Sequence, residues 1–397
     1  MSEWHVRIVK EIGSLPAGDW DAMVGVGESP FLEWDWLEAL EVTGCVAPEK
    51  GWAPHHVVVE REGRLIGACP LYLKGHSEGE FIFDYEWAYA ADNAGINYYP
   101  KLLVAVPFTP ANGIRFLTAP GEERVELIRV MAQALIHICD QNGLSSVHIN
   151  FCRDDEIAAL KPLGFLERLG LQYHWENHDY GEFEDYLSNF RSKRRTKIRR
   201  ERREMTDQGI TIRALSGDEI PDDLVPTMYR LYAEHVDNLY WGRRYLNQDF
   251  FERIAERFRR NLCFVVAESR GEVLAGTFNV QKAGVFYGRY WGAFEEVKHL
   301  HFNVCYYSAI EHCIQSGLQR MEPGAGGDFK QLRGFDPRPT RSLHYLAHSG
   351  LRDAVADHLE RERERMGLVI EHLNDRSQLK GGNGALPSSE PSSDVGD

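Results

Sequence analysis

The most regular hydrophobic pattern in the chain covers residues 262–347. It begins with three runs of apolar, β-branched and aromatic residues, separated by short polar turns at 269–272 and 282–284. Such runs and turns predict two successive antiparallel hairpins. Apolar residues then recur at helical spacing over 304–314, and a short strand follows that ends at Glu322. Three antiparallel strands, a helix and a further strand predict an α/β domain.

The same order of elements occurs earlier in the chain. Residues 56–88 predict three strands, 122–142 a helix and 146–151 a further strand. Both copies continue into a short segment that ends in Gly-Phe, LKPLGF at 160–165 and KQLRGF at 330–335. A repeat of about 200 residues indicates a duplicated domain, because solenoid repeats are much shorter. Chance similarity between two ordinary α/β runs is the alternative.

The repeat leads to a prediction for the organisation of the whole chain, whose 397 residues suffice for two domains. We expect an α/β protein with mixed α+β sheets, divided into an N-terminal domain (1–176) and a C-terminal domain (177–350). The C-terminal domain carries a basic helix at 183–205. A terminal helix is expected at 351–377 and a disordered tail at 378–397, which is rich in Gly, Ser and Pro.

The composition is that of an ordinary globular protein, with 43% hydrophobic and 26% charged residues. The seven cysteines form no CxxC pair, which is typical of a reducing compartment. No apolar run is long enough for a membrane span, and the N-terminus lacks the apolar core of a signal peptide. These features predict a soluble cytoplasmic protein.

The net charge of −15 conceals a strongly basic segment at 191–203, which holds nine basic residues and one acidic residue. On the predicted helix Arg191, Arg195, Arg199 and Arg203 recur at i, i+4 spacing, so their charges repel one another. An anionic ligand would relieve this repulsion, and nonspecific nucleic-acid binding would use the same stripe. A solvated face, or pairing with the acidic remainder of the protein, is the alternative.

A long irregular segment at 91–121 interrupts the first copy of the repeat. It contains Tyr98, Tyr99, Thr109 and Arg115. Long loops in compact domains are usually functional or disordered, and the aromatic residues argue against disorder. We therefore expect this segment to line a substrate site. A structural loop that packs its aromatic side chains is the alternative.

Most common catalytic signatures are absent, since the sequence contains no G-x-S-x-G, no P-loop and no H-E-x-x-H. The histidine pairs at 299/301 and 344/348 have spacings that a metal can use. No set of cysteines or carboxylates completes a site around them, so no metal site is expected.

The remaining candidate for chemistry is the loop that follows Glu322. A carboxylate at this point can act as a base on an amine or hold a substrate ammonium. Lys330 and Arg333 can stabilise the oxyanion of a tetrahedral intermediate in acyl transfer, and His344 can do either job. The alternative is a structural turn in which Glu322 and Asp328 pair with Lys330 and Arg333.

Six segments together carry a family resemblance: YGRYWGA (287–293), LHFNVCYY (300–307), EPGAGGDFKQLRGFDPRPTRSLH (322–344), YYPKL (98–102), VPFTPANGIR (106–115) and RSKRRTKIRRERR (191–203). They resemble the FemAB-like family of predicted N-acyltransferases, which is described as peptidoglycan biosynthesis/recognition proteins. The resemblance covers about residues 5–350. It implies two tandem GNAT-like domains with the acyl-CoA N-acyltransferase fold.

The chain is also similar to Fem-type aminoacyl transferases, which join an amino acid from aminoacyl-tRNA to an amine of a cell-wall precursor. In those enzymes a lysine near the end of the second domain serves the tetrahedral intermediate, and Lys330 is the matching position. The chain departs from ordinary acetyltransferases at 294–303, FEEVKHLHFN, where a glycine-rich loop would bind the pyrophosphate of CoA. This departure favours a larger donor than acetyl-CoA.

We therefore predict an N-acyltransferase that transfers an acyl or aminoacyl group from an activated donor to an amine, on a peptidoglycan precursor or a small molecule. No tightly bound cofactor is expected; the co-substrate is acyl-CoA or aminoacyl-tRNA, and a tRNA would contact 191–203. The alternatives are a non-catalytic binding module for an anionic glycopeptide or RNA, and a conventional acetyl-CoA-dependent N-acetyltransferase. The expected catalytic residues are Lys330, Glu322 and Arg333, and the expected substrate-binding residues are Tyr290, Trp291, His301, Tyr98, Tyr99, Thr109, Arg115, Arg195, Arg199 and His344.

Overall fold

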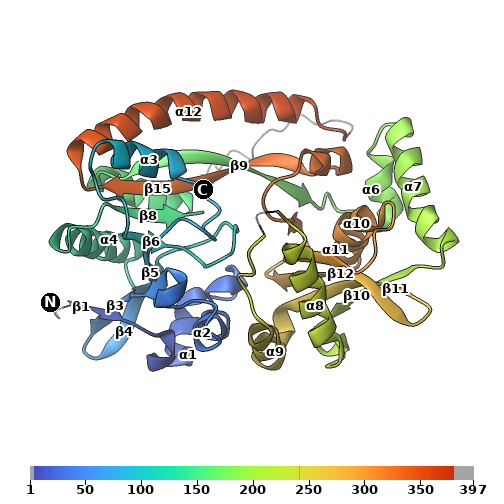
Figure 1. Cartoon of the computed structure of the whole chain (residues 1–397), viewed down its shortest axis with the longest axis horizontal. Helices are drawn as coiled ribbons and strands as arrows, with labels where there is room; N and C mark the ends of the chain where they lie inside the picture. The colour runs from blue at the N-terminus through green and yellow to red at the C-terminus, as the bar shows by residue number, and fades with distance from the viewer. Residues whose placement is uncertain (1–3, 241, 380–397) are drawn as a thin grey trace, which may run out of the picture.

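A computed structural model describes residues 4–240 and 242–379 of the chain. Nearly all of the predicted tail at 378–397 therefore lies outside the described residues. The described chain forms two α/β halves side by side, with the last helix lying across both of them (Figure 1).

The first half contains mainly short strands, with helices packed on both faces of its sheets. The predicted helix at 122–142 and strand at 146–151 are confirmed. Its main elements are β1 (Trp4–Val9), α1 (Ala17–Val24), α2 (Trp34–Val42), β2 (Trp52–Pro54), β3 (His56–Arg61), β4 (Arg64–Cys69), β5 (Leu71–Lys74), α3 (Tyr85–Asn93), β6 (Lys101–Val104), β7 (Leu117–Thr118), α4 (Arg124–Gln141), β8 (Ser146–Asn150), α5 (Asp154–Leu160) and β9 (Leu166–Glu176).

The second half confirms the predicted three-stranded meander, helix and short strand over 262–322. Its elements are α6 (Phe183–Ser188), α7 (Ser192–Asp207), β10 (Thr211–Ser216), α8 (Leu224–Asp237), α9 (Gln248–Arg257), β11 (Leu262–Ser269), β12 (Glu272–Lys282), β13 (Val285–Ala293), α10 (Leu300–Phe302), the π-helix η7 (Asn303–Tyr307), α11 (Ser308–Gln315), β14 (Arg320–Glu322), the 3₁₀-helix η8 (Asp328–Arg333), β15 (Asp336–Leu346) and α12 (Ser349–Asp375).

The two halves exchange their last strands. One sheet runs through both halves in the order β10-β11-β12-β13-β14-β9-β15-β8-β6-β5-β2, and a smaller sheet has the order β1-β3-β4-β7. Strand β9 of the first half pairs with β14 of the second, and β15 of the second half pairs with β8 of the first. The two exchanged strands also pair with each other along their length. Each half therefore completes the other's sheet, and the predicted boundaries at 176 and 350 remain a prediction.

Corresponding turns precede the two exchanged strands. Gly164 follows a 3₁₀ turn (Lys161–Leu163) before β9, and Gly334 follows η8 before β15. Both glycines have positive φ, which a residue with a side chain rarely adopts. Phe165 and Phe335 follow and are buried. The repeated Gly-Phe thus marks the same turn in both halves.

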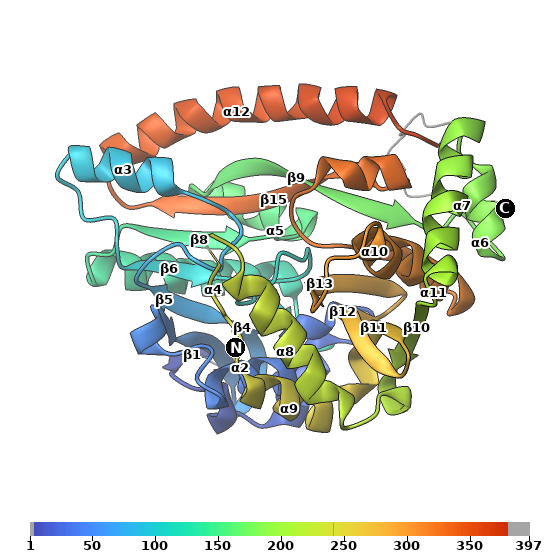
Figure 2. The same cartoon turned by 45° about the vertical axis from the view of Figure 1, so that its right-hand side comes forward.

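The two halves also share a hydrophobic core. Trp36 on α2 packs edge-on against Phe250 on α9, with ring centroids 5.2 Å apart. Phe31 packs in the same way against Tyr287 on β13, at 5.0 Å. Helix α12 covers β9 and β15 from above in both views (Figures 1 and 2). This packing fixes the position of one half against the other.

The three strands predicted within 56–88 are confirmed as β3, β4 and β5, and the end of that segment, where burial falls on Trp87, begins helix α3. One predicted element is wrong. The single helix expected at 183–205 is broken into α6 and α7, since the chain turns at 189–191 to bury Phe190.

None of the helices in the described ranges is both long enough and apolar enough to cross a membrane.

Candidate functional site

Strands β13 and β14 part from each other in the middle of the second half. They pair in parallel only over Val285–Tyr287 and Arg320–Glu322. Pro323 follows β14 and has no N–H with which to continue the ladder. At Gly288 an added Cβ would lie 3.1 Å from the Cα of Pro323, so glycine allows the two chains to cross closely before they diverge. The divergence leaves an opening in the sheet.

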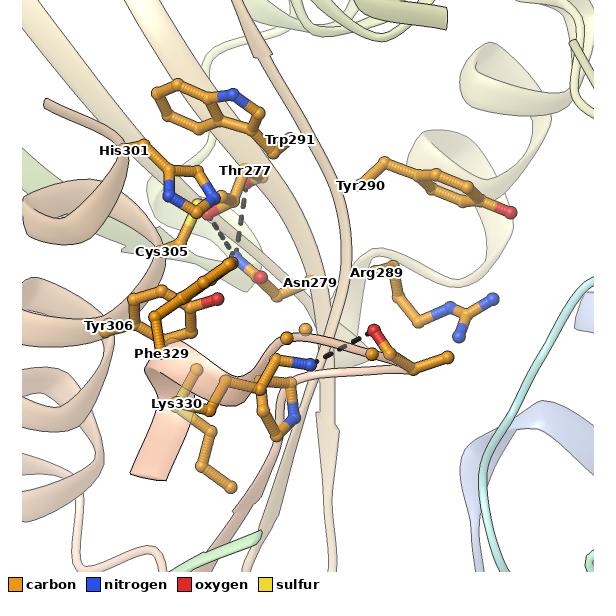
Figure 3. Close-up of a pocket in the computed structure, with 16 residues that line it drawn as sticks. Thr277, Asn279, Arg289, Tyr290, Trp291, His301, Cys305, Tyr306, Phe329 and Lys330 are labelled. Carbon is orange, nitrogen blue, oxygen red and sulfur yellow. Dashed lines mark hydrogen bonds between the residues drawn. The ribbon is translucent and has the colours of Figure 1, made fainter. Parts of the chain in front are cut away.

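A β-bulge lies beside this opening. Phe278 on β12 faces Tyr290 on β13, whereas the next residue, Asn279, faces Gly288. Arg289 is therefore the extra residue of β13, and a bulge of this kind redirects side chains near it. Arg289 points toward the first half of the molecule, whereas the ring of Tyr290 packs edge-on against Tyr232 on α8 (Figure 3).

A cavity of about 360 Å³ fills the opening (Figure 3). The π-helix η7 contributes Cys305 and Tyr306 to its wall, in keeping with the frequent placement of π-helical turns at functional sites. Its other side chains include Asn279, Arg289, Tyr290, Trp291, His301, Phe329 and Lys330. The wall is thus mainly aromatic, with a few polar groups.

A second cavity of about 480 Å³ adjoins the first and shares four residues with it, Arg289, Tyr290, Trp291 and His301. It reaches Phe81 of the first half and His235 on α8. The two cavities together therefore open between the halves. Pockets between packed units are common places for ligands.

Lys330 is the buried cation of the first cavity. Its side chain comes from η8, is 3% exposed, and donates hydrogen bonds from Nζ to the carbonyl oxygens of Gly324 (2.8 Å) and Ala325 (3.2 Å). An ammonium has three N–H donors, so one remains for a ligand. Burial lowers the pKa of Lys330 to about 8, and the group still keeps its proton at neutral pH.

His301 is a neutral histidine on the shared wall of the two cavities. Burial lowers its pKa to about 4, and the nearby charge of Arg333 acts in the same direction. The ring packs edge-on against Trp291, with centroids 5.1 Å apart. A neutral imidazole can accept a hydrogen bond from an amine.

Arg333, predicted as a second oxyanion group, lies behind the cavity and does not line it. Its guanidinium carbon stands 3.4 Å from the ring centroid of Phe302, and Nη1 donates to the carbonyl oxygen of Phe329 at 2.9 Å. Nη2 lies 3.6 Å from Glu201 on α7. These contacts hold η8 against α7 and the helix that follows β13.

Glu322, predicted as the base, also lies outside both cavities. Its Oε1 accepts a hydrogen bond from Nε of Arg320 at 3.0 Å, and its Oε2 has no hydrogen-bond partner among the described residues. Burial raises the pKa of Glu322 to about 7. The structural alternative pairs Glu322 and Asp328 with Lys330 and Arg333. Glu322 pairs instead with Arg320, and the side chain of Asp328 lies outside the described part of the structure.

Tyr98, Tyr99 and His344 belong to a buried polar network of the first half and line neither cavity. The network is centred on Lys101, whose Nζ donates to Asp84 at 2.5 Å. Tyr98 also donates to Asp84, at 2.6 Å, while Tyr99 bonds to Ser77 at 2.7 Å. His344 joins the network through His148, with their Nδ1 atoms 2.7 Å apart.

Thr109 and Arg115 have different surroundings. Thr109 Oγ1 lies 3.3 Å from Nη2 of Arg289, so Thr109 contacts a residue that lines the cavities but does not line them itself. Arg115 is buried beyond the end of the parallel pair β6–β8, the counterpart of β13–β14. Its Nε donates to the carbonyl oxygen of Asn150 and its Nη2 to that of Ala111, both at 2.6 Å. The chain itself therefore occupies the region of the first half that corresponds to the opening.

Arg195 and Arg199 lie on α7, at the outer side of the second half and away from the cavities (Figure 2). Arg199 forms an ion pair with Glu184 at 2.5 Å. Within the described residues, Arg195 and Arg203 form no ion pair, nor do Arg191 and Lys193 just before them. Part of the predicted basic stripe therefore stays unneutralised.

The sequence analysis missed several residues of the site. Arg289 is the most polar of them, and Tyr306 and Phe329 supply much of the aromatic wall. A glycine within a strand pattern suggests a bulge, so Gly288 was the signal that could have singled out its neighbour Arg289. Of the predicted residues, the structure brings together Lys330, Tyr290, Trp291 and His301. No group of three or more His, Cys, Asp or Glu side chains suited to a metal occurs among the described residues.

Comparison with known proteins identifies one family. The family model FemAB-like, described as peptidoglycan biosynthesis/recognition, matches residues 11–381. No curated protein matches the sequence.

Several solved structures share the fold. A crystal structure of FemX is 13% identical with a TM-score of 0.53, and the match covers 86% of this chain and 98% of FemX. The C-terminal domain of a putative lysylphosphatidylglycerol synthetase from Agrobacterium fabrum is 10% identical with a TM-score of 0.52, and the match covers 93% of this chain and 99% of that domain. A conserved protein of unknown function from Bacteroides thetaiotaomicron is 11% identical with a TM-score of 0.52, and the match covers 86% of this chain and 100% of that protein. These likenesses confirm the predicted fold class, a mixed α/β protein of two tandem GNAT-like halves.

Proposed function

The chain belongs to the FemAB-like family of peptidoglycan biosynthesis/recognition proteins, and from this premise we propose that it is an N-acyltransferase. It moves an acyl or aminoacyl group from an activated ester or thioester to an amine. The observation that carries the proposal is the Lys330 ammonium, which two carbonyl oxygens hold at the wall of the cavity between β13 and β14.

The position of Lys330 suits stabilisation of a tetrahedral intermediate. When the amine attacks the carbonyl carbon, the C–N bond forms and the carbonyl electron pair moves to oxygen. The remaining N–H of Lys330 then donates to this oxyanion in a site largely shielded from water, where such a bond is strong. Collapse restores the carbonyl and expels the oxygen or sulfur of the donor, which takes up the proton lost by the amine.

His301 assists by orienting the amine. Its neutral ring lines the same cavity as Lys330 and can accept a hydrogen bond from the amine N–H. Arg333 acts indirectly by holding η8, the element that carries Lys330. Lys330 and His301 thus contact the reacting groups, whereas Arg333 positions Lys330.

The donor proposed is larger than acetyl-CoA. An acetyltransferase binds the pyrophosphate of CoA with free N–H groups at the start of a helix. In this chain the corresponding helix is the one that follows β13. Here Glu295 and Glu296 are exposed just before that helix, and their charge disfavours a pyrophosphate. The unpaired basic residues on α7 favour a donor rich in phosphate, for which aminoacyl-tRNA is the candidate. The acceptor proposed, an amine of a peptidoglycan precursor, rests on the family description.

A thermal-shift panel on the full chain tests this proposal. The ligands are acetyl-CoA, a longer acyl-CoA, an aminoacyl-tRNA mimic and a nucleotide-linked muropeptide. A ligand at a hundred times its dissociation constant stabilises the folded state by about 2.7 kcal/mol. We expect stabilisation by the tRNA mimic or the muropeptide. The tRNA effect should weaken at high salt and in Arg195→Ala.

Other outcomes would change the account. Stabilisation by acetyl-CoA alone would identify a conventional N-acetyltransferase. Salt-sensitive RNA binding without any acyl transfer would favour a non-catalytic binding module, the second candidate, which the unpaired basic residues of α7 also support.

A further inference from the structure

Two buried polar atoms at the junction of the two cavities have no hydrogen-bond partner among the described residues. They are Nε of Arg289 and the hydroxyl of Tyr290. The two groups lie close enough to interact, since the Arg289 guanidinium opposes the rise that burial causes in the pKa of Tyr290, but they do not meet the geometry of a hydrogen bond. Both side chains line both cavities. Buried polar groups in folded proteins almost always have partners, so two unpartnered atoms on neighbouring residues call for an explanation.

Arg115, which is buried, shows the hydrogen bonds that an arginine with a structural role makes in this protein. Arg115 donates from Nε, Nη1 and Nη2 to the carbonyl oxygens of Asn150, Ile114 and Ala111. Arg289 instead uses only Nη2, toward the carbonyl oxygen of Phe108 and the hydroxyl of Thr109. These bonds anchor the guanidinium to the first half and leave Nε available at the cavity.

The charge around this point is positive. Among the side chains that the structure describes, which do not include that of Asp328, none that lines either cavity belongs to an Asp or a Glu, although the whole chain has a net charge of −15. Arg243 also lines the second cavity but is paired with Glu78. Lys330 and Arg289 form no ion pair with any side chain that the structure describes. A buried cation without a counterion is costly, and an anionic ligand would remove that cost.

We propose that Arg289 and Tyr290 form a subsite for an anionic oxygen group, a carboxylate or a phosphate, carried by a substrate of the transfer reaction. Nε of Arg289 and the hydroxyl of Tyr290 donate to the oxygens of this group. A guanidinium is suited to this role because its donors lie in one plane and match carboxylate and phosphate oxygens. The identity of the molecule that carries the anion rests on the proposed function, whereas the subsite itself does not.

Anion binding to the full chain, measured by isothermal titration calorimetry without any donor, tests the subsite. Inorganic pyrophosphate represents the phosphate source and N-acetylglycine the carboxylate source. We expect saturable binding of at least one of them, and the one that binds identifies the source. Tyr290→Phe should weaken this binding about tenfold, the effect of losing one hydrogen bond to a charged group.

The Tyr290→Phe variant has a second signature. Because the hydroxyl has no hydrogen-bond partner among the residues that the structure describes, its removal should leave the melting temperature unchanged or raise it, while the affinity for the anion falls. A tyrosine that serves packing alone would not combine a lower affinity with an unchanged or higher melting temperature. Arg289→Lys tests the arginine with its charge retained, and Tyr89→Phe, at an exposed position on α3, is the matched control.

The subsite would be contradicted if neither anion bound saturably, or if Tyr290→Phe bound as tightly as the wild type. These results are separable from a failure of the proposed function. Turnover that depends on Lys330 without any anion binding would remove only the subsite. Tyr290-dependent binding without acyl transfer would remove only the transferase.

Discussion

The Nδ1 atoms of His148 and His344 lie 2.7 Å apart, and this contact joins the two halves of the chain. His148 belongs to β8 and His344 to the exchanged strand β15, where the two residues are direct cross-strand partners. One ring must donate and the other must accept, so the contact requires that at least one imidazole be neutral. Burial lowers the pKa of both, that of His148 to about 3.

This histidine pair predicts a loss of stability in acid. Both folded-state pKa values lie below the ordinary value of 6.5, so the unfolded chain binds protons first as the pH falls. The free energy of unfolding contributed by the pair is complete above pH 6.5 and declines below it. His344→Gln should lower the free energy of unfolding by about 1–3 kcal/mol at pH 7. Between pH 7 and pH 5 the free energy of unfolding of this variant should fall by less than that of the wild type. Urea unfolding at both pH values measures this.

His137→Gln is the control for that experiment, because His137 is exposed on α4. It should unfold as the wild type does at both pH values. Equal acid sensitivity in His344→Gln and the wild type would mean that the pair does not govern the response.

The buried carboxyl of Glu322 predicts the opposite dependence on pH. Its pKa is raised from 4.5 to about 7, so the folded protein holds a proton that the unfolded chain has lost in this interval. The wild type therefore loses stability as the pH rises from 4.5 to 7. The free energy of unfolding of Glu322→Gln should exceed that of the wild type by about 1–3 kcal/mol above pH 7, and by less at pH 5. Melting temperatures at pH 5 and 8 measure the difference, with the exposed Glu234→Gln as control.

Strand exchange predicts that the first half does not fold by itself. A fragment of residues 1–176 leaves β8 without β15 on one side and leaves β9 without either neighbour. Such unpaired edges promote aggregation. We expect the fragment to be aggregated or unfolded by circular dichroism, and to recover structure when mixed with residues 177–379 during refolding. A stable monomeric fragment would instead support the predicted boundary at 176 as a true domain boundary.

The activity should fall at high pH through Lys330. Its pKa is lowered to about 8, so the ammonium that stabilises the oxyanion is lost as the pH rises through this value. We expect a descending limb near pH 8 in the rate of transfer. Lys330→Arg, if it retains activity, should lack this limb because arginine keeps its charge. A limb unchanged in that variant would assign it to another group.

Sequence patterns sufficed where local rules decide the structure. The meander at 262–293 and the strand ending at Glu322 follow from alternation and turns, and they are confirmed. The Gly-Phe repeat was informative because Gly164 and Gly334 both require positive φ. The resemblance of the motifs to a family correctly indicated the fold class.

The placement of the site residues depends on contacts far apart in the sequence and could not be read from it. Arg333 and Glu322 are near Lys330 in the chain, but η8 and β14 turn them away from the cavity. The position of His344 follows from strand exchange, which no local pattern encodes. Arg289 reaches the cavities only because the bulge opposite Phe278 adds a residue to β13.

Turnover of Lys330→Ala, compared with its folding, tests the central claim most directly. Using the donor that the thermal-shift panel identifies, we expect the rate of transfer to fall about 10²–10³-fold, the usual effect of losing one oxyanion donor. The melting temperature and circular dichroism should stay close to those of the wild type. Lys298→Ala, at an exposed position before α10, should be fully active. A folded Lys330→Ala protein with undiminished turnover would contradict the account.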